Sequence, residues 1–443
     1  MSKADFGRLD TDRSIQYNDK YFFPLLASIL LFRLIITFIS PYSIDMGGYV
    51  AWSKYLTEQG PAELYGSSGF HIVYAPFYQY FLWLTGEIVK LFPLPALLHI
   101  YLIKLWSVGF EVLGAFLIFK LSQKVNRTKQ GLIMAMVYVL NPGVFINSSV
   151  WGQFDSIPAT MLLGVLVLFE YKKHNLAALL FLIAVLTKPQ SGLLLPVVLY
   201  LYFKDFKWDL QFVKRLITGL LSGVFLYLAV VIPFYIPTDK SSQIPGFLDP
   251  FYWLFDLYFR SIKDYPYATA NAFNLWTLLG GQIQEDTLPF MGLTYISWGN
   301  ILLVLALAYA FFCLIKGKAN LYAITYFSFL VQFSAFFFMT KMHERYLLPA
   351  IIFIMLASVF DRRHLLTAGL LSLCVFFNHL YLYIISFEER YWLDRWDGLA
   401  IFLAAVTLLT YGLALYQGYN SFIKKTIANN PLNKEIGHER KNK

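Results

Sequence analysis

The sequence YFFPLLASILLFRLIITFIS, residues 21–40, decides how the rest of the chain is interpreted. Arg33 is its only charged residue, and a helix needs about 20 predominantly apolar residues to cross the hydrocarbon layer of a bilayer. The polar stretch before it, residues 1–20, does not have the form of a cleavable signal peptide. We therefore predict a membrane-spanning helix that also serves as the insertion signal.

The composition indicates that this span is one of many. Hydrophobic residues make up 58% of the 443 residues and charged residues 14%, whereas soluble domains have about 25% charged residues. Both cysteines, Cys313 and Cys374, lie within apolar runs, which argues against a disulfide framework and a thiolate metal site. The basic residues behind the net charge of +9 are spread over many loops, so no nucleic-acid partner is expected. We predict a polytopic membrane protein.

Further apolar stretches follow the first span. They lie at residues 98–119, 131–149, 157–171, 175–187, 191–203, 216–236, 297–315, 320–340, 347–360, 365–386 and 398–418. Together with residues 21–40 they predict an all-α bundle of about 12 transmembrane helices. We expect these helices to form a single transmembrane domain over residues 1–418.

The placement of lysine and arginine predicts the orientation. Cytoplasmic loops carry an excess of both residues, and most of the 36 fall on alternate loops, which places both termini and the basic tail 419–443 in the cytoplasm. The apolar stretch 74–92 would reverse every later loop if it crossed the membrane, so we interpret it as an interfacial helix in the first outside loop, residues 41–97. The same reasoning divides residues 175–203 into two short spans at Lys188. It leaves a second large outside loop, residues 237–296.

Several predicted outside turns carry ionisable groups that topology does not require. Asp45 follows the first span and precedes a Gly-Gly pair, where the backbone can turn closely around a ligand. Asp155 and Lys188 lie in later turns, and KMHER, residues 341–345, holds four charged or titratable side chains. A carboxylate can act as general base on a hydroxyl, while cations stabilise a departing phosphate. This combination suits transfer of a sugar from a lipid-phosphate carrier to an acceptor hydroxyl.

Each of these residues also has a structural interpretation. Asp45 and Asp155 could cap the helices that follow them, and Lys188 could extend towards the interface from the end of a span. Charged residues inside the spans are expected to pair across neighbouring helices, because unpaired charge is costly in lipid. These are Arg33, Lys104 and Glu111, of which the last two lie two turns apart on one helix face.

Five motifs, in order, resemble a known family. They are DMGGYVAW, WGQFDSIP, LTKPQ, ATANAFNLWTLLG and KMHERYLLPA. The chain resembles a family of integral membrane mannosyltransferases that includes the second mannosyltransferase of glycosylphosphatidylinositol-anchor assembly and has bacterial relatives. This family belongs to the GT-C glycosyltransferase superfamily. The resemblance implies a GT-C-like fold with an active site at the outer membrane face, a polyprenyl-phosphate sugar such as dolichyl- or undecaprenyl-phosphate mannose as donor, and inversion at the anomeric carbon.

The resemblance also implies roles for individual residues. The catalytic aspartate of the first outside loop is Asp45 here; it is followed by Met46 and Gly47 rather than by a second acidic residue, which argues against a metal-bridging pair. No metal or other cofactor is expected, and the lipid-linked sugar is a co-substrate. Donor phosphate would be bound by Lys188, Lys341, His343 and Arg345, with Glu344 orienting Arg345. Substrate contacts would come from Trp151, Gln153, Asp155, Gln190, Asn271, Asn274 and Trp276, the last three having a packed interfacial loop as the alternative.

The motif resemblance therefore implies a hexosyltransferase specific for mannose, with Asp45 as general base and a glycolipid, glycan or protein as acceptor. Its setting is the lipid bilayer, with the active site extracytoplasmic or lumenal, and the absence of a retrieval signal favours the bacterial plasma membrane over the endoplasmic reticulum. A secondary transporter or lipid-linked sugar flippase is the alternative, although such proteins place ionisable groups near the bilayer midplane. A non-catalytic subunit of a glycan assembly complex is a third interpretation.

Overall fold

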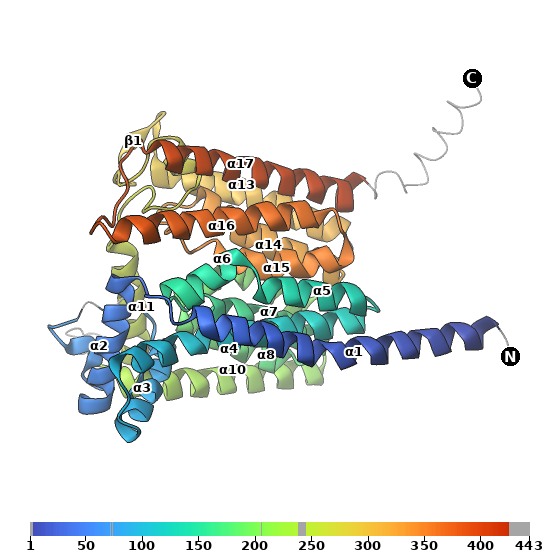
Figure 1. The fold of residues 1–443 in the computed structure, drawn as a ribbon, viewed down its shortest axis with the longest axis horizontal. Helices are drawn as coiled ribbons and strands as arrows, with labels where there is room; N and C mark the ends of the chain where they lie inside the picture. Colours follow the sequence, from blue (N-terminus) through green and yellow to red (C-terminus); the bar gives the residue numbers. More distant parts are fainter. Residues whose placement is uncertain (1–2, 71, 73, 205, 238–244, 425–443) are drawn as a thin grey trace. The chain divides into compact units, whose positions relative to one another are not determined.

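The computed structural model describes residues 3–70, 72, 74–204, 206–237 and 245–424, with the side chains of residues 3–19 outside this description. The chain forms two compact units. Unit 1 comprises Met1–Pro266 and Tyr383–Glu389, and unit 2 comprises Tyr267–Leu382 and Arg390–Lys443. Figure 1 shows that helices dominate both.

Unit 1 contains the helices of the first three fifths of the chain. They are α1 Lys3–Ile36, α2 Ser43–Gln59, α3 Pro76–Leu91, α4 Ala96–Lys124, α5 Thr128–Val139, α6 Pro142–Phe145, α7 Ser156–Glu170, α8 His174–Thr187, α9 Leu195–Phe203, α10 Leu210–Val231 and α11 Asp249–Lys263. Short 3₁₀ or π turns lie among them: η1 Leu64–Gly66, η2 Ile146–Trp151, η3 Pro189–Leu194 and η4 Ile232–Phe234. Helix α4 packs against α5 and α7, while α2 and α3 pack together and run across its direction (Figure 1).

Unit 2 begins with a loop that includes α12, Leu275–Leu278, and a short antiparallel hairpin of β1, Pro289–Phe290, and β2, Leu293–Thr294. Its long elements are α13 Tyr295–Lys316, α14 Leu321–Phe338, α15 Leu348–Phe360, α16 His364–Ser386 up to Leu382, α17 Gly398–Gly418 and η5 Tyr419–Lys424. Helix α14 is apolar on nearly every face, and it is buried where it packs against α13, α15 and α17.

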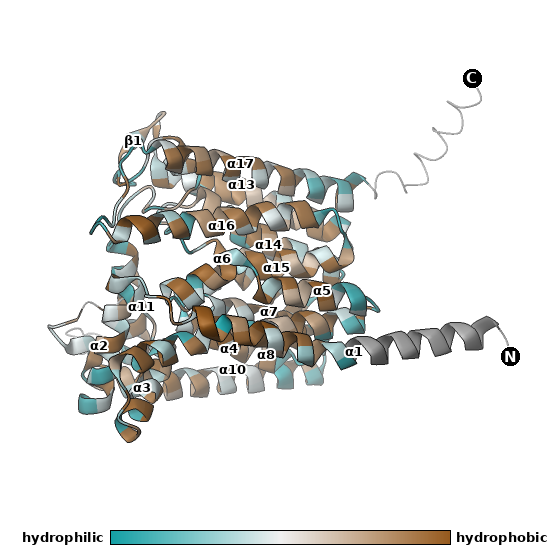
Figure 2. Cartoon of the chain, in the orientation of Figure 1, coloured by the Kyte–Doolittle hydropathy of each residue, from teal (hydrophilic) through white to brown (hydrophobic). Residues whose placement is uncertain are grey.

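The fold-class prediction, an all-α polytopic membrane protein, is confirmed. Within the described residues, the helices long and apolar enough to cross a membrane are Ala96–Lys124, Thr128–Trp151, Leu210–Phe234, Tyr295–Lys316, Leu321–Phe338, His364–Ser386 and Gly398–Lys424. Shorter apolar helices occupy Ser156–Glu170, His174–Thr187, Pro189–Phe203 and Leu348–Phe360. Of the first predicted span, residues 21–36 lie in α1, which ends at Ile36. Figure 2 shows hydrophobic residues along these helices. On α10 the exposed side chains include Leu220, Leu221 and Phe225, as expected for contact with lipid.

The first predicted outside loop holds two helices instead of one. The interfacial helix predicted at residues 74–92 is α3, whereas α2 was not predicted. The expectation that Gly47 and Gly48 form a tight turn is wrong, because both lie inside α2. This helix forms despite its glycines because it buries Met46, Tyr49 and Trp52.

The predicted division at Lys188 is present as a break between helices. Helix α8 ends at Thr187, and Lys188 is extended, with φ −151° and ψ 120°. Pro189 follows, and a residue before proline is disfavoured from helical geometry. The break therefore has a local cause in the sequence.

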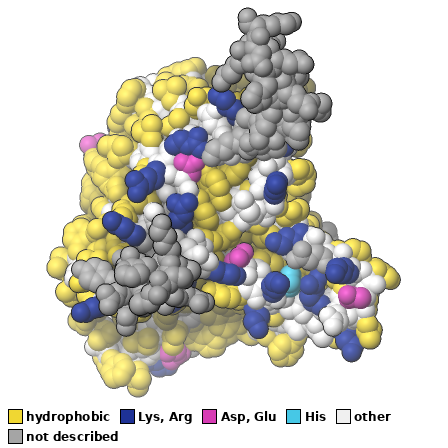
Figure 3. All heavy atoms as spheres, turned by 90° about the vertical axis from the view of Figure 1, so that its right-hand side faces the viewer, with side chains coloured by type: hydrophobic (Ala, Val, Ile, Leu, Met, Phe, Trp, Pro, Cys, Tyr) yellow, Lys and Arg dark blue, Asp and Glu magenta, His cyan; other side chains and the backbone are white. Residues whose placement is uncertain are grey.

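In the view of Figure 3, lysine and arginine side chains lie among hydrophobic ones. An excess of positive charge is expected of a cytoplasmic surface, and the orientation in the membrane stays a prediction. In the predicted tail, η5 continues the last helix to Lys424 and buries Phe422 and Ile423. The rest of the tail, residues 425–443, lies outside the described residues.

Candidate active site

Asp45 lies in the first turn of α2, where two side chains from another part of unit 1 hold its carboxylate. The indole Nε1 of Trp151 donates to Oδ2 at 2.7 Å, and Nε2 of Gln153 donates to the same oxygen at 2.6 Å. Within the described part of the chain, Oδ1 has no hydrogen-bond donor. The side chain is half-buried. This carboxylate therefore has one oxygen fixed and the other open to take a proton.

The two donors are themselves fixed by buried contacts. The Trp151 ring stacks on Tyr42, with 4.1 Å between ring centroids. Gln153 is fully buried, and its Oε1 accepts a hydrogen bond from the Tyr49 hydroxyl at 3.0 Å. Its backbone carbonyl accepts from Ser107 of α4 at 2.9 Å. These contacts aim both N–H groups at Asp45.

The backbone that carries these donors leaves helical geometry at η2, a π turn. The carbonyl of Asn147 accepts from the N–H groups of both Gly152 and Gln153, at 3.1 and 2.9 Å. Gly152 has φ +95°, and a Cβ there would collide with Cε of Met46 on α2. The left-handed backbone conformation therefore favours glycine at this position, whereas the flexible end of the Met46 side chain could move away from a Cβ. Turns of the π type often occur at functional sites.

Asp155 and Lys188 form a buried ion pair. The Lys188 ammonium donates to Oδ1 of Asp155, and Nδ2 of Asn147 donates to Oδ2 at 3.1 Å. The two side chains are 2% and 4% exposed. Although Asp155 occupies the N-cap position of α7, its side chain makes no capping bond. The capping interpretation of Asp155 and the interfacial interpretation of Lys188 are therefore both wrong.

Gln190 lies in η3, two residues beyond Lys188. Its side chain is half-buried, and its Oε1 is buried without a hydrogen-bond partner among the described residues. An unpaired buried oxygen of this kind can accept a hydrogen bond from a ligand hydroxyl or a water molecule.

The charged residues within the spans form a structural network. Arg33 pairs with Glu111, with both side chains fully buried, and also donates to Ser148 Oγ at 2.8 Å. Lys104 lies apart from this pair and donates to backbone carbonyls instead: Thr37 at 3.2 Å, Ile39 at 2.6 Å and Ser149 at 2.9 Å. This network ties the end of α1 to η2.

In unit 2, Asn271 is buried and bonded within the protein. It has φ +62°, and its Oδ1 accepts from Gln282 Nε2 at 2.6 Å and from the Leu393 N–H at 3.1 Å. Its Nδ2 donates to the Tyr391 carbonyl at 2.8 Å. Asn271 therefore joins three segments of unit 2.

Asn274 and Trp276 are likewise committed to the fold. Asn274 caps α12 by accepting from the N–H groups of Trp276 and Thr277, at 3.1 and 3.3 Å. The Trp276 indole donates to the Phe338 carbonyl at 2.8 Å, and its ring packs in a cluster with Ala268 and Tyr295. The packed-loop interpretation accounts for these contacts, and a sugar contact for any of the three residues stays a prediction.

The KMHER turn contains the pairing that its sequence predicts. Arg345 Nη1 donates to Glu344 Oε1 at 2.5 Å, and His343 Nδ1 lies 3.9 Å from Glu344 Oε2. Lys341 Nζ lies 3.5 Å from Oδ2 of Asp286, a buried carboxylate. The backbone of His343 bridges to Ala270 and Asn271, so unit 2 brings the KMHER and NAFNLW motifs together.

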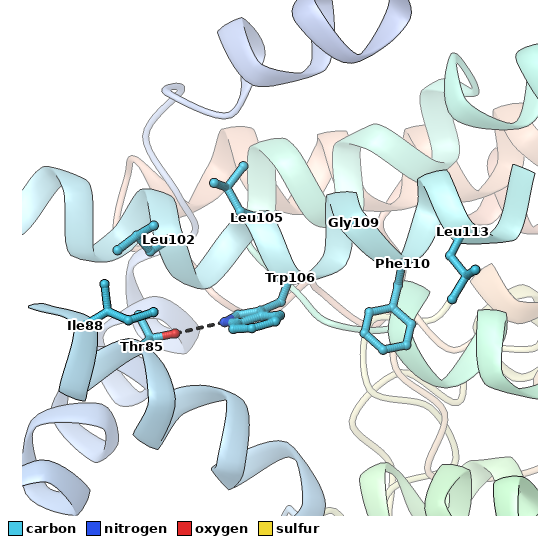
Figure 4. Close-up of a pocket in the computed structure, with 8 residues that line it drawn as sticks. All are labelled: Thr85, Ile88, Leu102, Leu105, Trp106, Gly109, Phe110 and Leu113. Atoms are coloured by element: carbon cyan, nitrogen blue, oxygen red, sulfur yellow. Dashed lines mark hydrogen bonds between the residues drawn. The ribbon is translucent and has the colours of Figure 1, made fainter. Parts of the chain in front are cut away.

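A cavity of about 390 Å³ lies between α3 and α4, and Figure 4 shows its lining. Its walls are almost entirely apolar, and its one polar pair is internally bonded, from Trp106 Nε1 to Thr85 Oγ1 at 2.9 Å. None of the residues predicted for the site lines it. Helix α4 thus presents one side to this cavity and, through Ser107, another to Gln153.

Sequence reasoning missed several partners of the site. Tyr49 is the clearest, and its position four residues after Asp45 on one helix was a usable signal. Asn147 and Asp286 gave no such signal, since their partners lie in other segments.

No family model and no curated protein matches this chain. Among solved structures it is similar to ArnT from Cupriavidus metallidurans in the apo state, at 14% identity and a TM-score of 0.47, over 91% of this chain and 78% of that one. It is also similar to ArnT from the same organism bound to undecaprenyl phosphate, at 14% identity and a TM-score of 0.44, over 90% and 77%. At this level of similarity, roles for residues here have to come from their own contacts.

Proposed function

We propose that the chain is an inverting membrane glycosyltransferase that transfers a hexose, mannose, from a polyprenyl-phosphate carrier to an acceptor hydroxyl on the extracytoplasmic face. The observation that carries this proposal is the geometry of Asp45, whose Oδ2 is held by Trp151 and Gln153 while Oδ1 has no donor among the described residues. This carboxylate lies at the start of the helix that follows α1, and α1 contains most of the first predicted span. The motif resemblance supports the same role.

In the proposed reaction, Asp45 acts as general base. The acceptor hydroxyl gives its proton to Oδ1, and its oxygen forms a bond to the anomeric carbon. The bond between that carbon and the phosphate oxygen breaks, and the polyprenyl phosphate leaves with the electron pair. Attack opposite the leaving group inverts the anomeric configuration. The two N–H donors hold the carboxylate in a fixed orientation, which favours in-line attack.

A phosphate-binding role for the KMHER turn stays a prediction of the motif resemblance; its cationic side chains offer charge-assisted N–H donors, which match phosphate oxygens well. Glu344 fixes Arg345 through its hydrogen bond, while Lys341 faces Asp286. Lys188 already has a carboxylate partner, so a phosphate role for it requires Asp155 to share the ammonium group.

Asp45→Asn tests the proposal. Asparagine keeps an oxygen for the donors but cannot take the proton, and loss of a general base costs about 10²- to 10⁴-fold in rate. Transfer would be measured with purified full-length protein, radiolabelled undecaprenyl-phosphate mannose and a membrane glycolipid extract, with products identified by mass spectrometry. The thermal unfolding midpoint should match that of the wild type. Transfer at the wild-type rate by the variant would reject the proposal.

One observation favours the transporter alternative. The helices α8 and α9 are interrupted at Lys188, which pairs with buried Asp155, and transporters often combine discontinuous helices with buried charge. Counterflow of labelled lipid-linked sugar across proteoliposomes, without a covalent product and unaffected by Asp45→Asn, would support transport over transfer.

A further inference from the structure

The cavity between α3 and α4 runs along a helix that is long and apolar enough to cross the membrane (Figure 4). We call it the α3–α4 groove, bounded by Thr85 and Ile88 of α3 and by the α4 residues from Leu102 to Leu113. These α4 residues cover roughly 16 Å of helix. Because the hydrocarbon layer of a bilayer is about 30 Å thick, the groove matches the depth of one leaflet.

The groove exists because α3 packs more closely on α2 than on α4. At Gly86 of α3, an added Cβ would lie 2.6 Å from the backbone carbonyl oxygen of Ser53 on α2. At Gly109, which lines the groove on α4, an added Cβ would meet no atom within 4 Å. The space beside Gly109 can therefore take a group that belongs to neither helix.

The groove is continuous with the surface that faces lipid. Gly109 is exposed, and Leu113 at one end of the groove is 43% exposed. On the flanking parts of the two helices, Leu84 and Leu97 are exposed as well. Exposed apolar side chains on a membrane span are expected to contact lipid. Hydrocarbon chains are therefore what the surroundings of the groove supply.

The lining suits a hydrocarbon chain better than water. Trp106 Nε1 donates to Thr85 Oγ1 at 2.9 Å, and this hydroxyl donates to the Phe81 carbonyl at 2.8 Å. The pair is thus bonded within the protein, whereas a buried water molecule needs about two to four polar partners. The rings of Trp106 and Phe110 pack against Phe81, with 5.0 and 5.8 Å between ring centroids. These contacts give the groove a fixed aromatic wall.

We propose that the α3–α4 groove holds one acyl chain of a bilayer phospholipid, which stays with the protein and completes the contact between the two helices. The proposal does not depend on sugar transfer. Lipid tails are as apolar as leucine, so the hydrophobic effect alone does not hold a chain here. Van der Waals contact with the walls of both helices retains it, because bulk lipid does not offer a surface of this shape.

A phospholipid fits this groove better than the polyprenyl-phosphate donor does. No cation is among the residues that line it, and recognition of a donor by its phosphate calls for charge-assisted N–H groups. The groove also lies on another side of α4 from the candidate site, which α4 contacts through the bond from Ser107 to the Gln153 carbonyl. The groove therefore offers contacts to a chain and leaves the headgroup at the interface.

The test fills the groove and counts retained lipid. Full-length protein would be purified in detergent, and the lipids that remain bound would be counted and identified by native mass spectrometry. The wild type should retain one phospholipid per chain. Gly109→Leu places a side chain in the groove without a clash and should lower this retention about tenfold, because the contacts to the acyl chain are lost.

Gly223→Leu is the matched control. Gly223 lies on α10, also a candidate span, and a Cβ added there likewise meets no atom within 4 Å. Leucine is a better helix former than glycine, so both variants should unfold at or above the wild-type temperature. Gly223→Leu should retain phospholipid at the wild-type level.

Crosslinking locates the retained chain in the wild type. The protein would be reconstituted with phosphatidylethanolamine that carries a diazirine on one acyl chain, extracted again in detergent and irradiated. Trypsin cleaves after Lys104 and Lys120, and the resulting peptide, residues 105–120, contains Trp106 and Gly109 of the groove. Crosslinks should concentrate on this peptide.

Each measurement can overturn the proposal. It would be wrong if the wild type retained no lipid, if Gly109→Leu retained as much as the wild type, or if Gly223→Leu lost as much as Gly109→Leu. Crosslinks spread evenly over the spans, or a retained polyprenyl phosphate in place of a phospholipid, would also overturn it. Because none of these measurements uses turnover, failure of the proposed function would show separately, as an active Asp45→Asn protein.

Discussion

Trp151 in unit 1 and Trp276 in unit 2 are both buried and both donate a hydrogen bond from the indole N–H, but their acceptors differ in kind. Their side chains are 2% and 1% exposed, and each donates its indole N–H, at 2.7 and 2.8 Å. Trp151 donates to the carboxylate of Asp45, whose second oxygen has no donor within the described residues. Trp276 donates to the backbone carbonyl of Phe338. The first bond holds a potentially reactive group, and the second stabilises a loop.

The buried amides extend this comparison. Gln153 accepts a hydrogen bond from Tyr49 and donates one to Asp45. Asn271 and Asn274, in contrast, bond mainly to backbone groups and to Gln282. Residue type and burial are therefore the same in both regions. What differs is the group that accepts the hydrogen bond. The Asp45 carboxylate has a second oxygen without a donor among the described residues, whereas the acceptors in unit 2 are mainly backbone carbonyls.

The largest expected effect concerns the Asp155–Lys188 pair, which lies in unit 1 but is satisfied within the protein. Lys188→Met would leave a buried carboxylate without its cation, and such changes cost about 3–5 kcal/mol. Asp155→Asn combined with Lys188→Met should recover most of this loss, because no uncompensated charge remains. The free energy of unfolding in a detergent titration measures both. A Lys188→Met protein with wild-type stability but poor donor use would show instead that this pair binds substrate.

The next largest effect concerns Arg345, a residue of unit 2 for which a binding role is predicted instead of a structural one. If Arg345 binds the donor phosphate, Arg345→Ala should raise the apparent KM for undecaprenyl-phosphate mannose about 10- to 100-fold, the value of a hydrogen bond to a charged group. The unfolding midpoint should change little.

Arg395, which is more exposed than Arg345, offers a control in the same unit. Its Nε donates to the Gly280 carbonyl at 2.7 Å, so Arg395→Ala should lower stability and leave the KM unchanged. Parallel losses of stability and donor use in Arg345→Ala would assign the KMHER turn to the fold.

The membrane helices could be predicted because their cause is local. A run of about 20 apolar residues is sufficient to span the bilayer. The alternation of positive charge between successive loops then predicts the side of the membrane on which each loop lies. Helix α2 could not be predicted in the same way, because its sequence, SIDMGGYVAWSKYLTEQ, contains two adjacent glycines, which disfavour a helix. The helix depends instead on the burial of Tyr49 and Trp52. Its stability comes from packing that the local sequence does not contain.

The site could be predicted as a set of residues but not as a set of contacts. Asp45 and Trp151 are 106 positions apart, and Asn271 and Leu393 are 122 apart. Motifs identified Trp151, Gln153, Asn271 and Trp276 equally well. Only the fold shows that the first two meet a carboxylate and the last two meet mainly the protein's own amides and backbone.

Matched substitutions of the two tryptophans test the comparison itself. Trp151→Phe removes one of two donors to Asp45 and should lower turnover about 10-fold, for a lost charge-assisted bond. Trp276→Phe leaves a buried carbonyl unpaired and should cost about 1–2 kcal/mol of stability, with turnover per folded molecule unchanged. Turnover would be measured at saturating donor, and stability by thermal unfolding. The opposite pattern, with Trp276→Phe slow but stable, would invalidate the distinction between the two regions.

The smallest expected effect belongs to a pair that serves as a purely structural reference. Asp361, in the loop between α15 and α16, accepts hydrogen bonds from Arg363, and these lower the pKa of its carboxyl well below the usual value. A carboxyl with a lowered folded-state pKa contributes stability above its unfolded pKa, about 3.9, and loses that contribution as pH falls through the folded-state value. Because Arg363 is half exposed, the contribution at neutral pH should be below about 1 kcal/mol. Asp361→Asn should therefore be slightly less stable than the wild type at pH 7, and the difference should shrink progressively below about pH 4. Thermal unfolding of both proteins across this range measures it, and a difference that stays constant with pH would show that the hydrogen bonds, rather than the charge of Asp361, stabilise the loop.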